Sequence, residues 1–166
     1  MGFLVTIADP EHTNVARVRA YAAERGVELV VRRFPAGTKT AEDAARAIGV
    51  EVGQIVKSLV FRAAHETLVA LCSGAARVDE SRLASASGAT AVRRATASEA
   101  KDATGYAIGG VPPFAHATGC RVFCDRRLLA YDEVWAASGL PDAVFSITPA
   151  DLVRLAGATV ADIAAH

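Results

Sequence analysis

Apolar positions along the chain fall into short runs that have the length and composition of β-strands. Ile55–Phe61 and Leu68–Cys72 are rich in aliphatic and β-branched residues, and the short segment 63–66 between them predicts a hairpin. Three further runs also predict strands: Val27–Phe34, Arg121–Cys124 and Ala143–Ile147.

Between these runs, polar residues and glycines mark where helices begin and end. Thr40 is placed to cap a helix that ends near Gly49, and Thr96 with Glu99 has the form of a capping box. Similar signals predict helices over 13–25 and 79–88, and a closing helix from residue 149. Strands interrupted by helices in this order predict an α+β fold with a mixed, largely antiparallel sheet.

The composition limits the size and location of the protein. The chain has 166 residues, 52% of them hydrophobic, and no long uninterrupted apolar span, so we expect a single domain over residues 1–166 and no membrane segment. Residues 1–9 lack a basic start and a long hydrophobic stretch, so they do not have the form of a signal peptide. We therefore expect a cytoplasmic protein.

The charge of the chain is balanced, with 18 basic and 18 acidic residues, which weakens the expectation of a nucleic-acid partner. Three arginine doublets stand at positions 32–33, 93–94 and 126–127. They either gather into one basic stripe or lie apart at solvated strand ends and turns. Their arrangement in space decides between the two.

The usual catalytic motifs and zinc-ligand spacings are absent from the sequence, so no metal and no cofactor are predicted. The candidate chemistry rests instead on Lys57, a charged residue inside the apolar run 55–61. The chain has fifteen arginines and three lysines, which together make its 18 basic residues, so a lysine here is a specific choice. The alternative is a lysine that reaches water from a strand edge.

A second candidate is the loop 105–114, which reads Gly-Tyr-Ala-Ile-Gly-Gly-Val-Pro-Pro-Phe. Its glycines allow the backbone to approach a ligand closely, and its prolines fix the shape of the loop. A β-branched residue at Gly110 is therefore expected to reduce activity more than stability. The alternative is an ordinary turn between a helix and a strand.

These two features stand in one order with the segments 38–45, 53–59 and 148–152, and the ordered set resembles the YbaK/ProX/EbsC family. Members of that family are aminoacyl-tRNA deacylase domains related to the editing domain of bacterial prolyl-tRNA synthetase. The resemblance runs from about Val15 to about Ile163. It implies a sheet that curls into a partly open barrel surrounded by helices.

The resemblance also implies roles for individual residues. Lys57 would be catalytic, holding the ester carbonyl or the adjacent ribose-phosphate as negative charge develops. The backbone of the loop would meet the aminoacyl group, with a proline keeping the loop rigid. The implied substrate-binding residues are Phe34, Thr40, Ser58, Gly109, Gly110, Val111, Pro113, Gly139 and Val144.

Several of these positions have a second explanation. Phe34 fits equally well as strand core, and Thr40 fits as a helix cap. Strand alternation places Ser58 on the face opposite Lys57. Gly139 matches the second glycine of a family turn whose first glycine is replaced here by Ser138.

Two functions from different classes follow. The first is a trans-editing hydrolase that binds the acceptor end of aminoacyl-tRNA and deacylates tRNA(Pro) carrying alanine, cysteine or serine, with prolyl-tRNA synthetase as a candidate partner. The second is a non-catalytic module of the same fold that binds a nucleotide, an aminoacyl group or a synthetase. The presence of Lys57 together with the loop Gly109–Pro113 favours the hydrolase. The sequence does not identify the amino acid or the oligomeric state.

Overall fold

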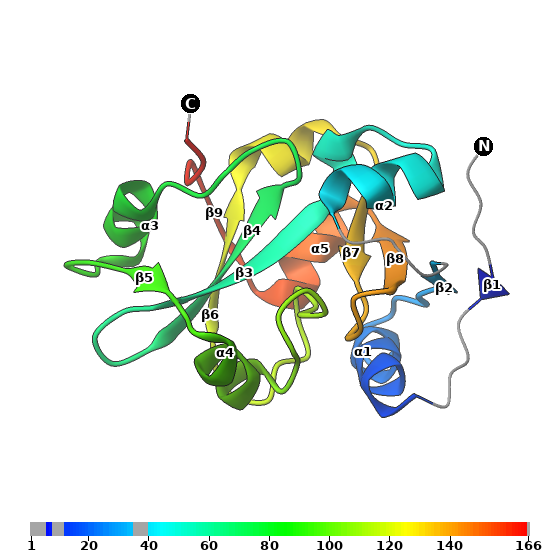
Figure 1. Ribbon diagram of the computed structural model, residues 1–166, viewed down its shortest axis with the longest axis horizontal. Helices are drawn as coiled ribbons and strands as arrows, with labels where there is room; N and C mark the ends of the chain where they lie inside the picture. The colour runs from blue at the N-terminus through cyan, green and yellow to red at the C-terminus, as the bar shows by residue number, and fades with distance from the viewer. Residues whose placement is uncertain (1–5, 8–11, 35–39, 166) are drawn as a thin grey trace.

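The computed structural model describes residues 6–7, 12–34 and 40–165. Within these residues, five α-helices and two short 3-10 helices surround two β-sheets (Figure 1). The helices are α1 (Thr13–Ala23), α2 (Ala41–Ile48), α3 (Glu80–Ser87), α4 (Ala97–Thr104) and α5 (Pro149–Ala156), and the 3-10 helices are η1 (Val52–Gln54) and η2 (Arg126–Ala130).

The limits of α2 and α4 follow from their capping residues. The Asp43 N–H donates to Thr40 Oγ at 3.0 Å, and the Asp43 carboxylate accepts the Thr40 N–H in return. Thr96 and Glu99 form the same reciprocal box at the start of α4. Gly49 ends α2 with a φ of 88°, a left-handed conformation that glycine adopts without steric cost.

The first sheet has four antiparallel strands in the order β1-β2-β8-β7. Their bounds are β1 (Thr6–Ile7), β2 (Val31–Arg33), β7 (Val134–Ala137) and β8 (Ala143–Ile147). One face of this sheet packs against α2 in a hydrophobic cluster that includes Phe34, Trp135 and Val144 from the sheet and Ala44 from the helix. This face forms part of the candidate site.

The second sheet has five strands in the order β5-β3-β4-β6-β9. Their bounds are β3 (Val56–Arg62), β4 (Thr67–Ser73), β5 (Arg93–Arg94), β6 (Arg121–Asp125) and β9 (Thr159–Ala161). β3 and β4 form an antiparallel hairpin, whereas β6 runs parallel to both β4 and β9. In Figure 1, α3 and α4 lie beside this sheet, and α1 lies below the first sheet.

The two sheets meet where the beginning of β3 reaches β7. A parallel bridge joins Ile55 to Trp135 at this point. Behind it, Val60 and Val69 of the second sheet share the main core cluster with Ala136 and Phe145 of the first. The start of β3 is therefore the point at which the second sheet contacts the first.

The predicted fold class is confirmed: the protein is α+β, with mixed, largely antiparallel strands. The strands form two sheets, which do not close into a barrel within the described residues. The strand predicted over Val27–Phe34 was too long, because only Val31–Arg33 pair with β8. The sequence did not predict β1, β5, β7 or β9, since each of them is only two to four residues long.

None of the helices in the described part of the chain combines the length and the apolar character of a membrane-spanning segment. The same residues contain no group of three or more His, Cys, Asp or Glu side chains that could hold a metal ion.

Candidate functional site

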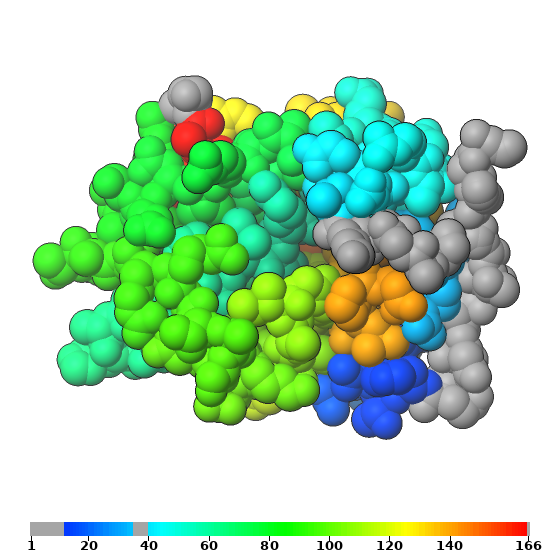
Figure 2. Space-filling model, in the orientation of Figure 1, coloured from blue at the N-terminus to red at the C-terminus, as the bar shows by residue number. Residues whose placement is uncertain are grey.

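A cavity of about 480 Å³ lies where α2, the start of β3, β7 and the loop after α4 come together. Figure 2 shows this face of the molecule, with α2 in cyan, the loop after α4 in yellow-green and the turn between β7 and β8 in orange. The walls are mostly apolar, and among the described lining residues the cationic side chains are Lys57 and Arg94. No carboxylate is among the described lining residues.

The cavity brings together most of the residues that the sequence analysis selected from distant parts of the chain. Seven of them line it: Phe34, Thr40, Lys57, Ser58, Gly109, Val111 and Val144. Gly110, Pro113 and Gly139 do not line it. All three are buried, and each lies within two residues of a lining residue in the sequence. The described residues therefore form one site from β2, α2, β3, β8 and the loop after α4.

The edge of β3 is open beside the cavity because its neighbour on that side, β5, is very short. β5 pairs only with Phe61 and Arg62, at the far end of β3. The carbonyl oxygen of Val60 points to this edge, where it accepts the Ala95 N–H at 2.9 Å. Backbone groups alternate in direction along a strand, so the N–H and C=O of Ser58 point to the same edge.

Ser58 and Lys57 both line the cavity, even though they are adjacent on the strand. An open strand edge explains this, because side chains from both faces of the strand border a cavity located at its edge. The Ser58 Oγ atom is buried and has no hydrogen-bond partner in the structure. In this state Ser58 offers the site its backbone groups rather than a hydroxyl held in place.

The side chain of Lys57 is half-buried, and its position is fixed by a backbone carbonyl. Lys57 Nζ donates to the Ala76 carbonyl oxygen at 2.5 Å. Ala76 lies in the turn that follows β4, and β4 pairs directly with β3 through Lys57 and Cys72. An ammonium has three donors, so two remain for a ligand.

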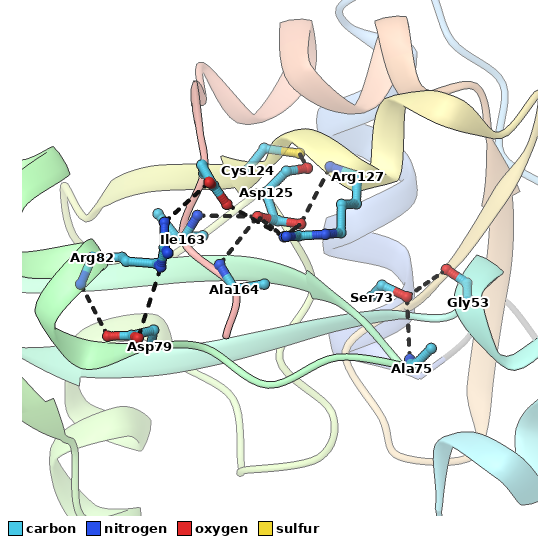
Figure 3. A network of polar contacts seen from close by, with 11 residues as sticks. Gly53, Ser73, Ala75, Asp79, Arg82, Cys124, Asp125, Arg127, Ile163 and Ala164 are labelled. Atoms are coloured by element: carbon cyan, nitrogen blue, oxygen red, sulfur yellow. Dashed lines mark hydrogen bonds and ion pairs between the residues drawn. The ribbon is translucent and has the colours of Figure 1, made fainter. Parts of the chain in front are cut away.

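The turn that carries Ala76 is itself held by a buried hydroxyl (Figure 3). Ser73 Oγ donates to the Gly53 carbonyl at 2.8 Å and accepts the Ala75 N–H at 3.1 Å. Gly74 leaves no room for a side chain, because a Cβ there would lie 2.6 Å from the Val52 carbonyl oxygen. The hydrogen bonds of Ser73 therefore help to determine where the Lys57 ammonium is held.

In the loop after α4, neighbouring residues have different environments. Gly109 has a φ of 94°, is exposed and lines the cavity, and Val111 lines the cavity from a buried position. The Gly110 N–H instead donates to the Ala107 carbonyl at 2.9 Å. A Cβ on Gly110 would lie 3.0 Å from the Leu140 backbone.

The environment of Gly110 changes one expectation from the sequence. A side chain at this position would push the loop away from the turn between β7 and β8, so stability and activity should fall together. Gly139, in that turn, has a similar role, because a Cβ there would lie 2.9 Å from Asn14 Cβ. Asn14 also donates to the Gly139 carbonyl at 3.0 Å, which ties α1 to the turn.

The far part of the loop is braced by two side chains. Tyr106 donates its hydroxyl to the Ala115 carbonyl, and His116 Nε2 lies 2.8 Å from the Pro112 carbonyl oxygen. A carbonyl only accepts, so Nε2 carries the proton. Burial lowers the pKa of His116, and the hydrogen bond to Pro112 opposes this effect only in part. Ala115 has a φ of 66°, which is unusual for a residue with a side chain.

The lining residues that sequence reasoning did not select include Arg94, Ile108, Trp135 and Pro141. Trp135 is buried in the wall formed by β7, and the Arg32 guanidinium lies 5.5 Å from its ring centroid. Trp135 is the single tryptophan of the chain, which was the available signal for a wall residue. The short strand that carries it was not predicted. Ile108 is exposed at the rim of the cavity.

The comparisons with known proteins identify the family of the chain. Residues 35–155 match the family described as the aminoacyl-tRNA editing domain. This region contains every selected site residue except Phe34. The chain belongs to the aminoacyl-tRNA editing domain family.

Three relatives illustrate the range of this similarity. A crystal structure described as a candidate trans-editing enzyme for prolyl tRNA synthetase superposes with a TM-score of 0.88 at 44% identity, covering 93% of this chain and 98% of that one. The uncharacterized protein YwhH of Bacillus subtilis (strain 168) is 32% identical over 140 residues, which is 84% of this chain and 88% of YwhH. Proline–tRNA ligase of Pelotomaculum thermopropionicum is 32% identical over 107 residues, but these are only 19% of the ligase.

Proposed function

We propose that this protein is a trans-acting editing hydrolase that deacylates mischarged tRNA, with tRNA(Pro) carrying alanine, cysteine or serine as its substrate. The observation that carries the proposal is the cavity in which the half-buried Lys57 faces the same space as Gly109 and Val111. In an editing-domain family, a cation beside a backbone-lined cavity has the chemistry needed to bind an aminoacyl ester at the acceptor end of tRNA.

The proposed reaction is hydrolysis of the ester between the amino acid and the terminal ribose. Water adds to the carbonyl carbon, the bond to the ribose oxygen breaks, and that oxygen takes up the proton released by the attacking water. Free amino acid and uncharged tRNA are the products. The ester is already activated by its α-ammonium group and the neighbouring hydroxyl, so positioning and charge stabilisation supply most of what is needed.

In this reaction Lys57 stabilises the negative charge that develops on the carbonyl oxygen. One of its donors is used by the Ala76 carbonyl, which sets the position of the ammonium before the substrate binds. Lysine offers a compact charge, and a fixed donor of this kind contributes more in the transition state than in the ground state. In this proposal Lys57 acts as an electrostatic group and not as a base.

The backbone around the cavity positions the aminoacyl group. The open edge of β3 presents the N–H and C=O of Ser58, and Gly109, which also lines the cavity, allows a ligand to approach the backbone closely. The N–H of Gly110 is already bonded within its turn, so Gly110 contributes by packing, not by donating to the substrate. Pro113 is buried and helps to keep the loop rigid.

The walls limit which side chains fit. Phe34, Trp135 and Val144 are buried and apolar where they line the cavity, and Thr40 lies at its rim as the cap of α2. Such walls exclude bulky groups by steric clash, but they separate small side chains only weakly, since one methylene is worth about 1 to 3 kcal/mol. We therefore expect small aminoacyl esters to react at similar rates.

A deacylation screen tests this function. Purified full-length protein is incubated with a panel of mischarged tRNAs, and release of the amino acid is followed for each. We expect turnover of small esters on tRNA(Pro) and protection of correctly charged prolyl-tRNA. Inactivity on every ester would favour a non-catalytic module that binds a nucleotide, an aminoacyl group or a synthetase.

The proposal also concerns the cellular setting. The chain would act as one domain over residues 1–166, in the cytoplasm, on tRNA that prolyl-tRNA synthetase has mischarged. Co-purification with the synthetase, with and without tRNA, tests whether the two form a complex.

A further inference from the structure

The three arginine doublets share one pattern of ion pairing. In each doublet, one arginine binds a carboxylate: Arg33 binds Asp142 at 2.8 Å, Arg93 binds Glu99 at 2.8 Å, and Arg127 binds Asp125 and Asp162 (Figure 3). The other member of each doublet has no carboxylate partner within the described part of the chain. These members are Arg32, Arg94 and Arg126. The three free members lie on different elements: Arg32 on β2, Arg94 on β5 and Arg126 on η2.

Arg94 is the unpaired member that lines the cavity. It is exposed on β5, and its guanidinium lies 5.5 Å from the ring centroid of Phe61, the residue with which it pairs across the sheet. The nearby Glu99 does not neutralise it, because Glu99 is bonded to Arg93 and to the Thr96 N–H. These two contacts lower the pKa of Glu99 to about 2, so that carboxylate stays charged and paired with Arg93.

The spacing of the two cations fits a ligand longer than a single charged group. Arg94 is in register with Phe61, four residues along β3 from Lys57, which corresponds to about 13 Å at the usual strand rise. Both cations line one cavity that has no carboxylate among its described residues. A chain whose net charge is zero therefore concentrates positive charge at this cavity.

We propose that Arg94 binds a phosphodiester of the single-stranded 3′ end of RNA while Lys57 binds the reacting ester. The proposal rests on the function proposed above. A guanidinium provides two parallel donors that match the geometry of a phosphate, and its contact with the Phe61 ring restricts where it can lie. The terminal nucleoside would lie between the two cations, along the open edge of β3.

The test compares Arg94→Ala with Arg126→Ala, which removes the free member of another doublet outside the cavity. The binding of uncharged tRNA and of a short single-stranded RNA with a free 3′ end is measured over a series of salt concentrations. For Arg94→Ala we expect affinity to fall roughly tenfold and the slope of log K against log salt to decrease by about one, as for the loss of one phosphate contact. Arg126→Ala should match the wild type, and Arg94→Lys should lie between.

These measurements separate the two proposals. Arg94-dependent RNA binding by a protein that deacylates no ester would keep the phosphate site and remove the hydrolase function. Active deacylation with unchanged KM and salt slope in Arg94→Ala would overturn the phosphate site, and so would the absence of any RNA binding by the wild type. Adenosine monophosphate is the last probe: if it binds as tightly as the RNA, the site is for a free nucleotide and the proposal is wrong.

Discussion

The ammonium of Lys57 is held by the carbonyl oxygen of Ala76, 2.5 Å away, in the turn that follows β4. The candidate catalytic group is thus aligned by the backbone of the turn after the neighbouring strand and not by an acidic side chain. A carboxylate in that place would neutralise the charge that the proposed reaction needs. A carbonyl orients the ammonium and leaves its charge intact.

Replacing Lys57 should remove activity and leave the fold in place. The loss of one charged donor to a developing oxyanion typically costs roughly 2.7 to 4 kcal/mol, so we expect Lys57→Ala to lower kcat by two to three orders of magnitude. Lys57→Arg should also be poor, because a longer, planar group cannot place a point donor at the same position. Single-turnover deacylation and melting curves measure both effects. Lys101→Ala, at an exposed position of α4, is the matched control. Full activity in Lys57→Ala would contradict the mechanism.

Ser73→Ala should reduce activity through the turn that anchors Lys57. The change leaves the Gly53 carbonyl and the Ala75 N–H without their partner, which costs about 1 to 3 kcal/mol of unfolding free energy. Ser87→Ala is the control, because Ser87 is also buried and donates to a backbone carbonyl, at Ala84, outside the cavity. We expect both variants to have a lower melting temperature and only Ser73→Ala to have a lower kcat. Equal activity in the two variants would show that the turn does not control Lys57.

Gly110→Ala should lower stability and activity together. The added Cβ meets the Leu140 backbone at 3.0 Å, so the loop or the facing turn must shift, at a cost of about 1 to 3 kcal/mol for such overpacking. Chemical denaturation and turnover are to be measured on the same preparation. Gly119→Ala is the comparison, since a Cβ on Gly119 meets no atom within 4 Å. Loss of turnover without loss of stability in Gly110→Ala would restore a direct contact with the substrate.

Ala115→Gly should stabilise the protein. Ala115 has a φ of 66°, and the left-handed region costs a residue with a Cβ roughly 1 to 2 kcal/mol, which glycine avoids. Part of this gain is offset by the greater flexibility of glycine in the unfolded chain and by loss of the buried Ala115 methyl group, so we expect a net increase of at most about 1 kcal/mol. Ala91→Gly, at an exposed loop position without a positive φ, should give no increase. A lower melting temperature for Ala115→Gly would refute the strain.

Stability should fall in mildly acidic solution because of His116. Burial lowers the pKa of His116 below its ordinary value of 6.5, so the unfolded chain takes up the proton more readily than the folded chain. The neutral form is favoured in the fold, and stability is therefore lost as the pH falls below about 6.5. His116→Asn keeps a donor for the Pro112 carbonyl and should flatten the dependence between pH 6.5 and the range where carboxylates titrate. His65→Asn, at an exposed position, should keep the wild-type profile.

The sequence predicted the parts of the site that depend on local signals. The run 55–61 and the cap at Thr40 were identified from strand composition and helix-start signals, and the structure brings both to the cavity. It did not predict Trp135 as a wall, because β7 has four residues and is stabilised by pairing with β8, not by its own pattern. The contact between Lys57 and Ala76 depends on the packing of a turn nineteen residues away in the chain, which no local pattern encodes.

The open edge of β3 separates two properties that are joined in many enzymes. The groups at that edge belong to the main chain, and every residue except proline carries them, so substitutions along the strand leave them in place. Selectivity is assigned to different atoms, the side chains of Phe34, Trp135 and Val144 that line the walls. If the proposed function holds, a lineage with this architecture can change the size and shape of the walls, and so accept a different aminoacyl group, without changing the backbone groups proposed to hold the ester.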